Sequence, residues 1–418
     1  MKYNPYQPNR IVAPGMFTGR LDEIAAVEKS LFQAKHGNPI HFIISGERGI
    51  GKSSLLMLVS RIASSEVNLL EDQKFNLLVV PVELGNVGSQ IEIVRAIARQ
   101  FKSELQRISA NVEIAKSVWD FLSNWEVLGV RYHKSDVAPE PESARDSLAD
   151  QMAEFCKHSG YDGIFIAIDE ADAPSADAGL GEFLKYFTER LSRIGCNKVL
   201  FGLAGLPILL DRIRSSHPSA ARIFNLLNLA PLGSDERMEV VKRGLAEAND
   251  KNNVETVITD DGLVLLAELS EGYPHFIQQF AYCAFESDVD DTIDAADVVD
   301  GAYQDGGAIA QLGTKYFDDL YFGKISSERY RNILNSMSEF GDQWLSRKQI
   351  INLSGESSTT VSNALNALKS RNILIADNTR QGFYKLPTRS FAAWINAIKS
   401  VEGRRQIDHT SRLPLEPS

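Results

Sequence analysis

A glycine-rich stretch near the N-terminus carries the residue types that bind a polyphosphate. Residues 46–53, Gly-Glu-Arg-Gly-Ile-Gly-Lys-Ser, match the pattern GxxxxGK[ST] in full. Glycines let the backbone N–H groups of such a loop wrap around phosphates, and the helix that follows adds the positive end of its dipole. Lys52 can reach the β- and γ-phosphates, and the Ser53 hydroxyl can hold Mg²⁺. The sequence therefore predicts a site for ATP with Mg²⁺.

The segments on either side of this loop have the order that the motif requires. Residues 40–45 are a short apolar run, typical of a buried strand, and residues 54–60 have a helical pattern. A chance glycine turn before a helix is the less favoured alternative. The residues predicted to contact the nucleotide are those of the loop and of the helix start: Gly46, Glu47, Arg48, Gly49, Ile50, Gly51, Lys52, Ser53 and Ser54.

A second chemical signal stands at the end of a later apolar strand. Residues 163–170 are GIFIAIDE, in which four apolar residues lead into an acidic pair. Asp169 would hold Mg²⁺ together with Ser53, and Glu170 would orient and polarise the attacking water. Such a pair is common by itself, but after a complete P-loop it indicates an ATPase. The run Asp-Glu-Ala-Asp at 169–172 spells a helicase motif, and no other helicase motif accompanies it.

Composition places these motifs in a multidomain globular chain. The chain has 418 residues, so two or three domains are expected, and 44% of them are hydrophobic. No apolar run is long enough to span a membrane, and the N-terminus lacks a signal-peptide core. Cys156, Cys196 and Cys283 are few, far apart and without metal-ligand spacing, which favours a reducing compartment. We therefore expect a cytoplasmic protein with no membrane contact.

The net charge of −11 is unevenly distributed. Residues 233–305 hold 18 acidic and 4 basic side chains, whereas residues 323–400 hold 11 basic and 5 acidic side chains. Any contact with nucleic acid is therefore expected in the C-terminal part.

The pattern along the chain predicts six segments. They are an N-terminal strap with a first helix (1–35), an α/β nucleotide-binding core (36–232), a helical lid (233–305), a linker (306–322), a winged helix (323–400) and a flexible tail (401–418). Within the core we expect further strands at 77–84, 198–203 and 220–232. Pro81 favours an edge position for the strand at 77–84.

Together these segments resemble an AAA+ P-loop ATPase of the initiator-type (origin-recognition-like) and STAND-related group. The resemblance rests on the P-loop, the acidic strand end, the turn Ala-Gly-Leu-Pro at 204–207 and the segment from Arg222 to Leu232. It implies an α/β core with a parallel sheet, an all-α lid and a C-terminal winged helix. A strap that ends in Phe-Thr-Gly-Arg at 17–20 resembles the segment that borders the adenine. Residues 204–207 lack the polar group that many relatives use to position water, which implies slow hydrolysis.

Three further residues are implicated by this resemblance. Arg222 falls in the arginine-finger region, where it would reach the γ-phosphate held by a neighbouring subunit of a nucleotide-dependent homo-oligomer. A salt bridge at a strand edge is the alternative for this residue. Pro274 and His275, in the run Gly-Tyr-Pro-His at 272–275, resemble the STAND GxP motif and a second sensor that touches the nucleotide. A capped histidine at a helix start is the alternative.

Residues 323–400 fit three helices, two short strands and a closing helix. The third helix, 357–370, is predicted to turn polar residues outward, and Lys369, Arg371 and Arg380 are predicted to contact phosphates of DNA. The predicted outward residues are Thr359, Thr360, Asn363, Asn366 and Lys369. Because this helix carries little positive charge, a protein-contact module is the alternative.

Three functions are compatible with these features. The favoured one is a slow ATPase switch that couples nucleotide state to a DNA-binding winged helix, as in an initiator or a transposition regulator. The second is a STAND-type signalling or defence ATPase whose winged helix contacts protein. The third is a nucleotide-binding scaffold with little hydrolysis. Salt-dependent DNA binding separates the first from the others.

Overall fold

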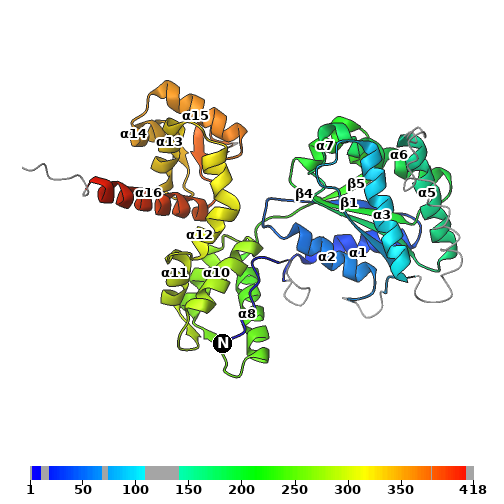
Figure 1. The fold of residues 1–418 in the computed structure, drawn as a ribbon, viewed down its shortest axis with the longest axis horizontal. Coiled ribbons are helices and arrows are strands. Elements are labelled where there is room, and N and C mark those ends of the chain that lie inside the picture. Colours follow the sequence, from blue (N-terminus) through cyan, green and yellow to red (C-terminus); the bar gives the residue numbers. More distant parts are fainter. Residues whose placement is uncertain (1, 11–17, 68–73, 109–140, 378, 411–418) are drawn as a thin grey trace, which may run out of the picture. The chain divides into compact units, whose positions relative to one another are not determined.

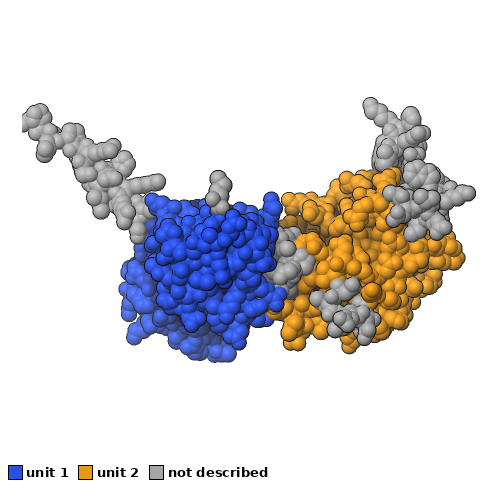
Figure 2. Space-filling model, turned by 90° about the horizontal axis from the view of Figure 1, so that it is seen from below, with its two compact units in different colours: residues 1–10, 231–418 blue, residues 11–230 orange. Residues whose placement is uncertain are grey.

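The structure is a computed structural model of the chain and describes residues 2–10, 18–67, 74–108, 141–377 and 379–410. The chain forms two compact units. Unit 2 comprises residues 11–230, and unit 1 comprises residues 1–10 with residues 231–418 (Figure 2). Parts of four predicted segments lie outside the described residues: residues 11–17 of the strap, residues 68–73 and 109–140 of the core, residue 378 of the C-terminal domain and residues 411–418 of the tail.

A five-stranded parallel sheet forms the centre of unit 2, in the order β2-β3-β4-β1-β5 (Figure 1). Its strands are β1 (His41–Ser45), β2 (Leu77–Glu83), β3 (Gly163–Asp169), β4 (Val199–Gly205) and β5 (Phe224–Asn228). The strand that carries Pro81 is an edge strand, as predicted, because proline has no N–H to donate to a second neighbour. Since all strands are parallel, the residues that follow β1, β3 and β4 meet at one edge.

Helices cover both faces of this sheet (Figure 1). Two helices, α1 and α2, pack on one face, and four helices, α3, α5, α6 and α7, pack on the other. Their bounds are α1 (Leu21–Lys35), α2 (Lys52–Ala63), α3 (Gln90–Ile108), α5 (Pro141–His158), α6 (Leu180–Arg193) and α7 (Leu209–Ser216). Two short 3-10 turns, η3 (Ala176–Ala178) and η4 (Ala220–Ile223), precede α6 and β5.

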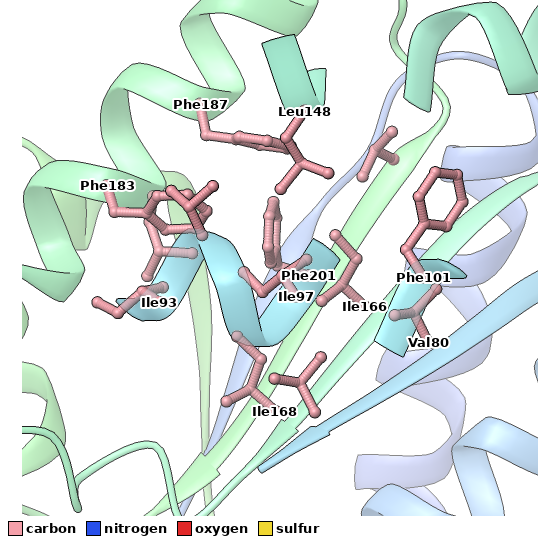
Figure 3. Close-up of a cluster of buried hydrophobic side chains, with 14 of the residues drawn as sticks. Val80, Ile93, Ile97, Phe101, Leu148, Ile166, Ile168, Phe183, Phe187 and Phe201 are labelled. Carbon is pink, nitrogen blue, oxygen red and sulfur yellow. The ribbon is translucent and has the colours of Figure 1, made fainter. Parts of the chain in front are cut away.

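The larger core of unit 2 lies between the sheet and the helices α3, α5 and α6 (Figure 3). Ile166 and Phe201 of the sheet meet Ile97, Leu148 and Phe187 of the three helices, and all five side chains are buried. Each side chain of this kind contributes about 1.5–3 kcal/mol when fully buried. β3 and β4 are buried along nearly their whole length and pair from Ile164 with Val199 to Ile168 with Leu203, so this packing fixes where the two strands end.

Unit 1 begins with the helical lid. Its helices are α8 (Ser234–Lys251), α9 (Asp260–Leu269), α10 (Pro274–Ser287) and α11 (Ala295–Tyr303), and a short parallel pair, β6 (Val257–Ile258) and β7 (Thr292–Ile293), joins two of its connections. The first helix is capped at Gly233, whose N–H donates to Glu236 Oε2 at 2.8 Å. A cap at this position places a glutamate three residues later, as a capping box requires.

Residues 2–10 pack against the lid helices α8 and α10. Tyr6 is buried, and its hydroxyl donates to the carbonyl oxygen of Val241 at 2.7 Å. Gly244 lies against this ring, so that a Cβ there would come within 2.2 Å of Tyr6. The first ten residues, which the sequence analysis assigned to the strap, are therefore packed with the lid.

The predicted linker, 306–322, is a packed helical element. It contains α12 (Ala308–Leu312) and two π-helical turns, η5 (Gly313–Phe317) and η6 (Asp319–Gly323). Leu312, Phe317 and Tyr321 are buried. Trp394 packs so closely on Gly313 that a Cβ there would lie 2.0 Å from its ring nitrogen. These apolar residues anchor the segment predicted as a linker within unit 1.

The C-terminal domain has the order helix, strand, helix, helix, strand, strand, followed by a closing helix. Its elements are α13 (Glu328–Ser338), β8 (Leu345–Ser346), α14 (Arg347–Ser354), α15 (Ser358–Ser370), β9 (Ile375–Ala376), β10 (Phe383–Lys385) and α16 (Arg389–Thr410). The strands form an antiparallel sheet in the order β8-β10-β9. The predicted tail, 401–418, is helical as far as Thr410, because no proline interrupts the chain before Pro414. Within the described part of the chain, no helix is long and apolar enough to cross a membrane.

Candidate nucleotide-binding site

The predicted phosphate loop lies between β1 and α2. Gly49 and Gly51 have φ angles of 77° and 97°, in the left-handed region that glycine adopts most readily. A Cβ on Gly46 would come within 2.8 Å of the Ile50 side chain. The helix starts at Lys52 without a hydrogen bond from a capping side chain. The loop thus presents a tight backbone turn and a helix start whose N–H groups suit an anion.

Lys52 is folded over this loop. Its Nζ donates to the carbonyl oxygens of Gly46 at 2.9 Å and of Glu47 at 2.8 Å. Burial lowers the pKa of Lys52 below its ordinary value, and this effect is opposed first by the charge of Asp172 and then by that of Asp169. The ammonium group therefore lies at the loop, within electrostatic reach of two carboxylates.

Arg20 supports the loop from the start of α1. Its side chain is buried, and Nη2 donates to the carbonyl oxygen of Ile50 at 3.2 Å. A longer contact of 3.5 Å pairs Arg20 with Glu23. The sequence analysis placed Arg20 only at the end of the strap. Its contact with the P-loop depends on how α1 docks, which no local pattern reveals.

The acidic pair at the end of β3 lies at the same edge of the sheet. Asp169 is the last residue of the strand, and its Oδ1 accepts the N–H of Glu170 at 2.9 Å. Glu170 is exposed and has a φ of 47°, which turns the chain sharply after the strand. Ser53 and Asp169 both line a cleft of about 1060 Å³ that extends along α2, β2 and α3. The structure thus brings the two predicted magnesium ligands to one cleft.

A carboxylate that the sequence analysis did not select lies at the end of β4. Asp172 Oδ1 accepts the N–H of Leu206 at 2.9 Å, and the N–H of Ala171 donates to the carbonyl oxygen of Ala204 at 2.9 Å. The loop after β3 is therefore docked on the end of β4, where the sequence shows no polar side chain. In the sequence, Asp172 is the second aspartate of the run at 169–172. The sequence analysis considered it only as part of a helicase motif and gave it no role.

Arg222 lies in the short turn η4 that precedes β5, at the edge strand opposite β2. Its side chain is exposed. Among the described residues it forms no ion pair, so the salt bridge considered as an alternative is not found there. Arg222 is thus available at the sheet edge for a contact outside the described chain.

Pro274 and His275 open α10 in unit 1. Gly272 has a φ of 81°, and its carbonyl oxygen accepts the N–H of Leu232 at 2.8 Å. Burial lowers the pKa of His275 to about 4, and its ring packs edge-on against Tyr316 at 5.2 Å. Its Nε2 is buried and finds no hydrogen-bond partner within the described part of the chain. His275 is therefore a neutral imidazole with an unused ring nitrogen.

The third helix of the C-terminal domain, α15, presents a polar face. Four of the five residues predicted to face outward are exposed and Thr360 is half-buried, whereas Val361, Leu365 and Leu368 are buried. The exposed ones are Thr359, Asn363, Asn366 and Lys369. The helix begins at a cap in which Ser357 Oγ accepts the N–H of Thr360 at 3.1 Å. This arrangement gives a surface of hydroxyl and amide groups with a single lysine.

The other two predicted phosphate contacts are engaged within the domain. Arg380 pairs with Asp377 at 2.6 Å and lies 4.8 Å from the centre of the Phe383 ring. Arg371 donates to the carbonyl oxygen of Lys324. Each guanidinium keeps further N–H donors beyond these contacts, and both side chains are exposed.

Comparison with known proteins supports the fold described above. Residues 36–210 match the family model of the AAA domain. The chain is 24% identical over 283 residues to an uncharacterised HTH-type transcriptional regulator of Methanocaldococcus jannaschii, a match that covers 66% of this chain and 65% of that protein. The chain thus matches less than two thirds of that relative's length.

Two solved structures share the fold over nearly the whole chain. The Walker-type ATPase of Pyrococcus abyssi is 15% identical with a TM-score of 0.55, covering 91% of this chain and 96% of its own. The ORC2 protein of Aeropyrum pernix, solved as ADPNP–ADP complexes, is 16% identical with a TM-score of 0.58, covering 97% and 99%. The chain therefore shares the overall fold of these two proteins, with an α/β P-loop core followed by a helical lid, as the sequence predicted.

Proposed function

We propose that this protein is an ATP-dependent switch, which binds ATP with Mg²⁺ at the P-loop, hydrolyses it slowly and transmits its nucleotide state to a DNA-binding C-terminal domain. The observation that carries the proposal is the convergence of Lys52, Asp169 and Asp172 at one edge of the parallel sheet. The relative solved with ADPNP and ADP supports the class of nucleotide. The relative described as an HTH-type transcriptional regulator supports DNA as the partner.

Each residue of the site has a separate task in this proposal. The N–H groups of residues 46–54 bind the phosphates, and Lys52 moves from the loop carbonyls to the β- and γ-phosphates. Ser53 and Asp169 would hold Mg²⁺, which supplies positive charge at the phosphate oxygens. Glu170, exposed next to this position, orients and polarises the attacking water.

Asp172 offers a physical reason for slow hydrolysis. A polar residue that helps to position water beside a γ-phosphate works best as a hydrogen-bond donor. The carboxylate of Asp172 is only an acceptor when ionised, and its negative charge acts on Lys52. It therefore places charge of the wrong sign near an incoming phosphate.

Within unit 1, the motif that contains Pro274 and His275 is joined to the C-terminal domain. Glu271, directly before this motif, accepts the N–H of Arg389 at 2.8 Å and of Ser390 at 2.7 Å, and so caps α16. These contacts support movement of the lid and α16 together, with Pro274 and His275 as the residues that report the nucleotide.

Aromatic contacts make a second connection between the same parts. The ring of Tyr316 packs against both His275 and Phe276 at 5.2 and 5.5 Å. Phe317 in turn lies 5.1 Å from Phe391 and 5.8 Å from Trp394 of α16. A shift of residues 272–275 would therefore displace α16 through direct side-chain packing, which supports the proposed coupling.

We propose further that Arg222 acts in trans in a nucleotide-dependent homo-oligomer. Its exposed position and the lack of an ion pair among the described residues support this role. The cysteines of the described chain are all free, which suits a reducing compartment such as the cytoplasm.

A STAND-type signalling ATPase is the second candidate, and the engaged arginines favour it. Because Arg380 and Arg371 already have partners within the C-terminal domain, Lys369 is the remaining predicted phosphate contact on the exposed helix face. A surface with hydroxyl and amide groups and one charge also suits a protein partner.

Binding of the full-length protein to duplex DNA, measured by fluorescence anisotropy at several salt concentrations, separates these candidates. The Glu170→Gln protein in ATP should represent one nucleotide state, and the wild-type protein in ADP the other. We expect affinity that differs between the two states and falls as salt rises. If the protein binds no DNA at low salt in either state, the protein-contact function is favoured. A separate measurement of ATP affinity tests the nucleotide site independently of DNA.

A further inference from the structure

A second cleft lies in unit 2, at the edge of the sheet away from the P-loop. It has a volume of about 690 Å³ and is lined by α5, by the end of α6 and by residues 194–198, which lead into β4. Since β4 runs seven residues from this edge to Gly205, about 23 Å separate the cleft from the strand ends that carry the candidate nucleotide site.

Cys156 and Cys196 meet in this cleft although 39 residues separate them in sequence. Cys156 comes from α5 and Cys196 from the turn before β4, and the two thiols are close enough for each to shift the pKa of the other. Both side chains are half-buried and both line the cleft, so they are accessible to small molecules. The third cysteine, Cys283, is buried in unit 1.

The environment favours one of the two thiols as the nucleophile. The interaction with Cys156 lowers the pKa of the Cys196 thiol to about 7; burial opposes this shift, and the backbone and the charge of Lys198 reinforce it. The same interaction and then burial raise the pKa of Cys156.

The acidic groups of the cleft have partners of their own. Asp150 pairs with Arg190 at 2.8 Å, and Glu154 lies 2.9 Å from His158. Lys157 and Lys198 add positive charge to the lining. A thiolate at Cys196 is therefore stabilised by its neighbours.

We propose that Cys156 and Cys196 form a reversible dithiol–disulfide pair that responds to hydroperoxides. The thiolate of Cys196 attacks the peroxide oxygen, which breaks the O–O bond and yields a sulfenic acid and, after protonation of the leaving oxygen, an alcohol, or water where the oxidant is hydrogen peroxide. The Cys156 sulfur then attacks this sulfur, and the sulfenic hydroxyl leaves as water with the proton of Cys156. One hydroperoxide is reduced by two electrons, and a cellular thiol reverses the reaction by exchange.

The disulfide would link α5 covalently to the turn that leads into β4. Closing the loop between residues 156 and 196 restricts the unfolded chain, and we expect a rise in the melting temperature of unit 2 of about 5–10 °C. Because the bond forms at the opposite edge of the sheet, nucleotide binding at the P-loop should change little. The inference therefore does not depend on the proposed function.

Peptide mapping of the full-length protein tests this pair. The protein is treated with about one equivalent of hydrogen peroxide, blocked with iodoacetamide without reduction, digested and analysed by mass spectrometry. We expect a cross-linked peptide that joins Cys156 to Cys196 and disappears with dithiothreitol. The Cys156→Ser variant should instead accumulate a sulfenic acid at Cys196, trapped by dimedone. Cys283→Ser, the matched control, should form the cross-link as the wild type does.

Three results would overturn the proposal. One is oxidation of Cys196 to sulfinic acid in the wild type without a cross-link to Cys156. Another is a disulfide between two chains in place of the one within a chain. The third is a cross-link whose formation leaves the melting temperature of the wild type unchanged or lower.

Discussion

The P-loop and the face of α15 are two candidate ligand surfaces of this protein, and they are built from different parts. The P-loop relies on backbone N–H groups, since α2 starts without a side-chain cap, and on one half-buried lysine. At the start of α15, the Ser357 side chain already accepts the N–H of Thr360. The exposed face of this helix consists of separate polar side chains. In a main-chain site, a few groups provide most of the binding free energy. On a surface of separate side chains, the binding free energy is divided among many groups. Substitutions should therefore have large effects at the first surface and small ones at the second.

Glu170→Gln should give the largest effect at the P-loop edge. The amide keeps the size of the side chain but cannot polarise water as a carboxylate does, so turnover should fall by about 10²–10⁴. ATP affinity should stay within a factor of about two to three, because Glu170 is exposed beside the loop and bonds no phosphate. Phosphate release and ATP titration measure the two quantities.

The matched control for this prediction is Glu182→Gln, the same change at an exposed position of α6 in the same unit. Its turnover should equal that of the wild type. Unchanged ATP turnover in the Glu170→Gln protein would show that Glu170 is not the residue that activates water.

Lys52→Ala should weaken ATP binding by about 100-fold. The reason is the loss of charge-assisted hydrogen bonds to the phosphates, worth about 3 kcal/mol. Isothermal titration calorimetry gives the affinity directly. Lys29→Ala, at an exposed lysine of α1, is the control and should bind ATP as the wild type does. An affinity within threefold of the wild type would mean that Lys52 stays on the loop carbonyls when nucleotide binds.

The difference between the two surfaces also explains what the sequence could predict. The strand, loop and helix around Lys52 are contiguous, so eight residues were enough to predict the site and its order of elements. Arg20 and Asp172 reach the site only because α1 and the loop after β3 dock on other strands. Their contacts are tertiary, and no spacing in the sequence encodes them. The predicted strap cannot be judged in the same way, because residues 11–17 lie outside the described residues.

The helical turns within 306–322 were not predicted, and the reason is different. Their buried residues Leu312, Phe317 and Tyr321 are spaced by five and four positions, which fits π-helical turns better than the 3.6-residue period used to find helices. The lid helices, in contrast, are regular α-helices, and the sequence predicted a helical lid over 233–305. Local periodicity thus predicts regular helices well and misses irregular ones.

Asp172→Asn removes one negative charge at the P-loop edge and keeps the size and shape of the side chain. The amide oxygen can still accept the N–H of Leu206, and its NH₂ group can donate to a phosphate or a water. Removing the negative charge beside Lys52 should raise turnover by about three- to tenfold. The initial rate at saturating ATP is the measurement. Asp177→Asn, in the exposed turn η3, should have no effect. A lower rate in Asp172→Asn would mean that the carboxylate assists hydrolysis.

Lys369→Ala should have the smallest effect, at the face of α15. If the side chain contacts one phosphate, its removal lowers the slope of log affinity against log salt by about one unit and weakens binding of all sequences alike. Arg380→Ala should change the slope less, because Asp377, which pairs with Arg380 at 2.6 Å, offsets part of its positive charge. Lys242→Ala, at an exposed lysine of the acidic lid, is the control. If both C-terminal variants behave like this control while DNA binding persists, the face of α15 is not the DNA-binding surface, and the contrast drawn between it and the P-loop fails.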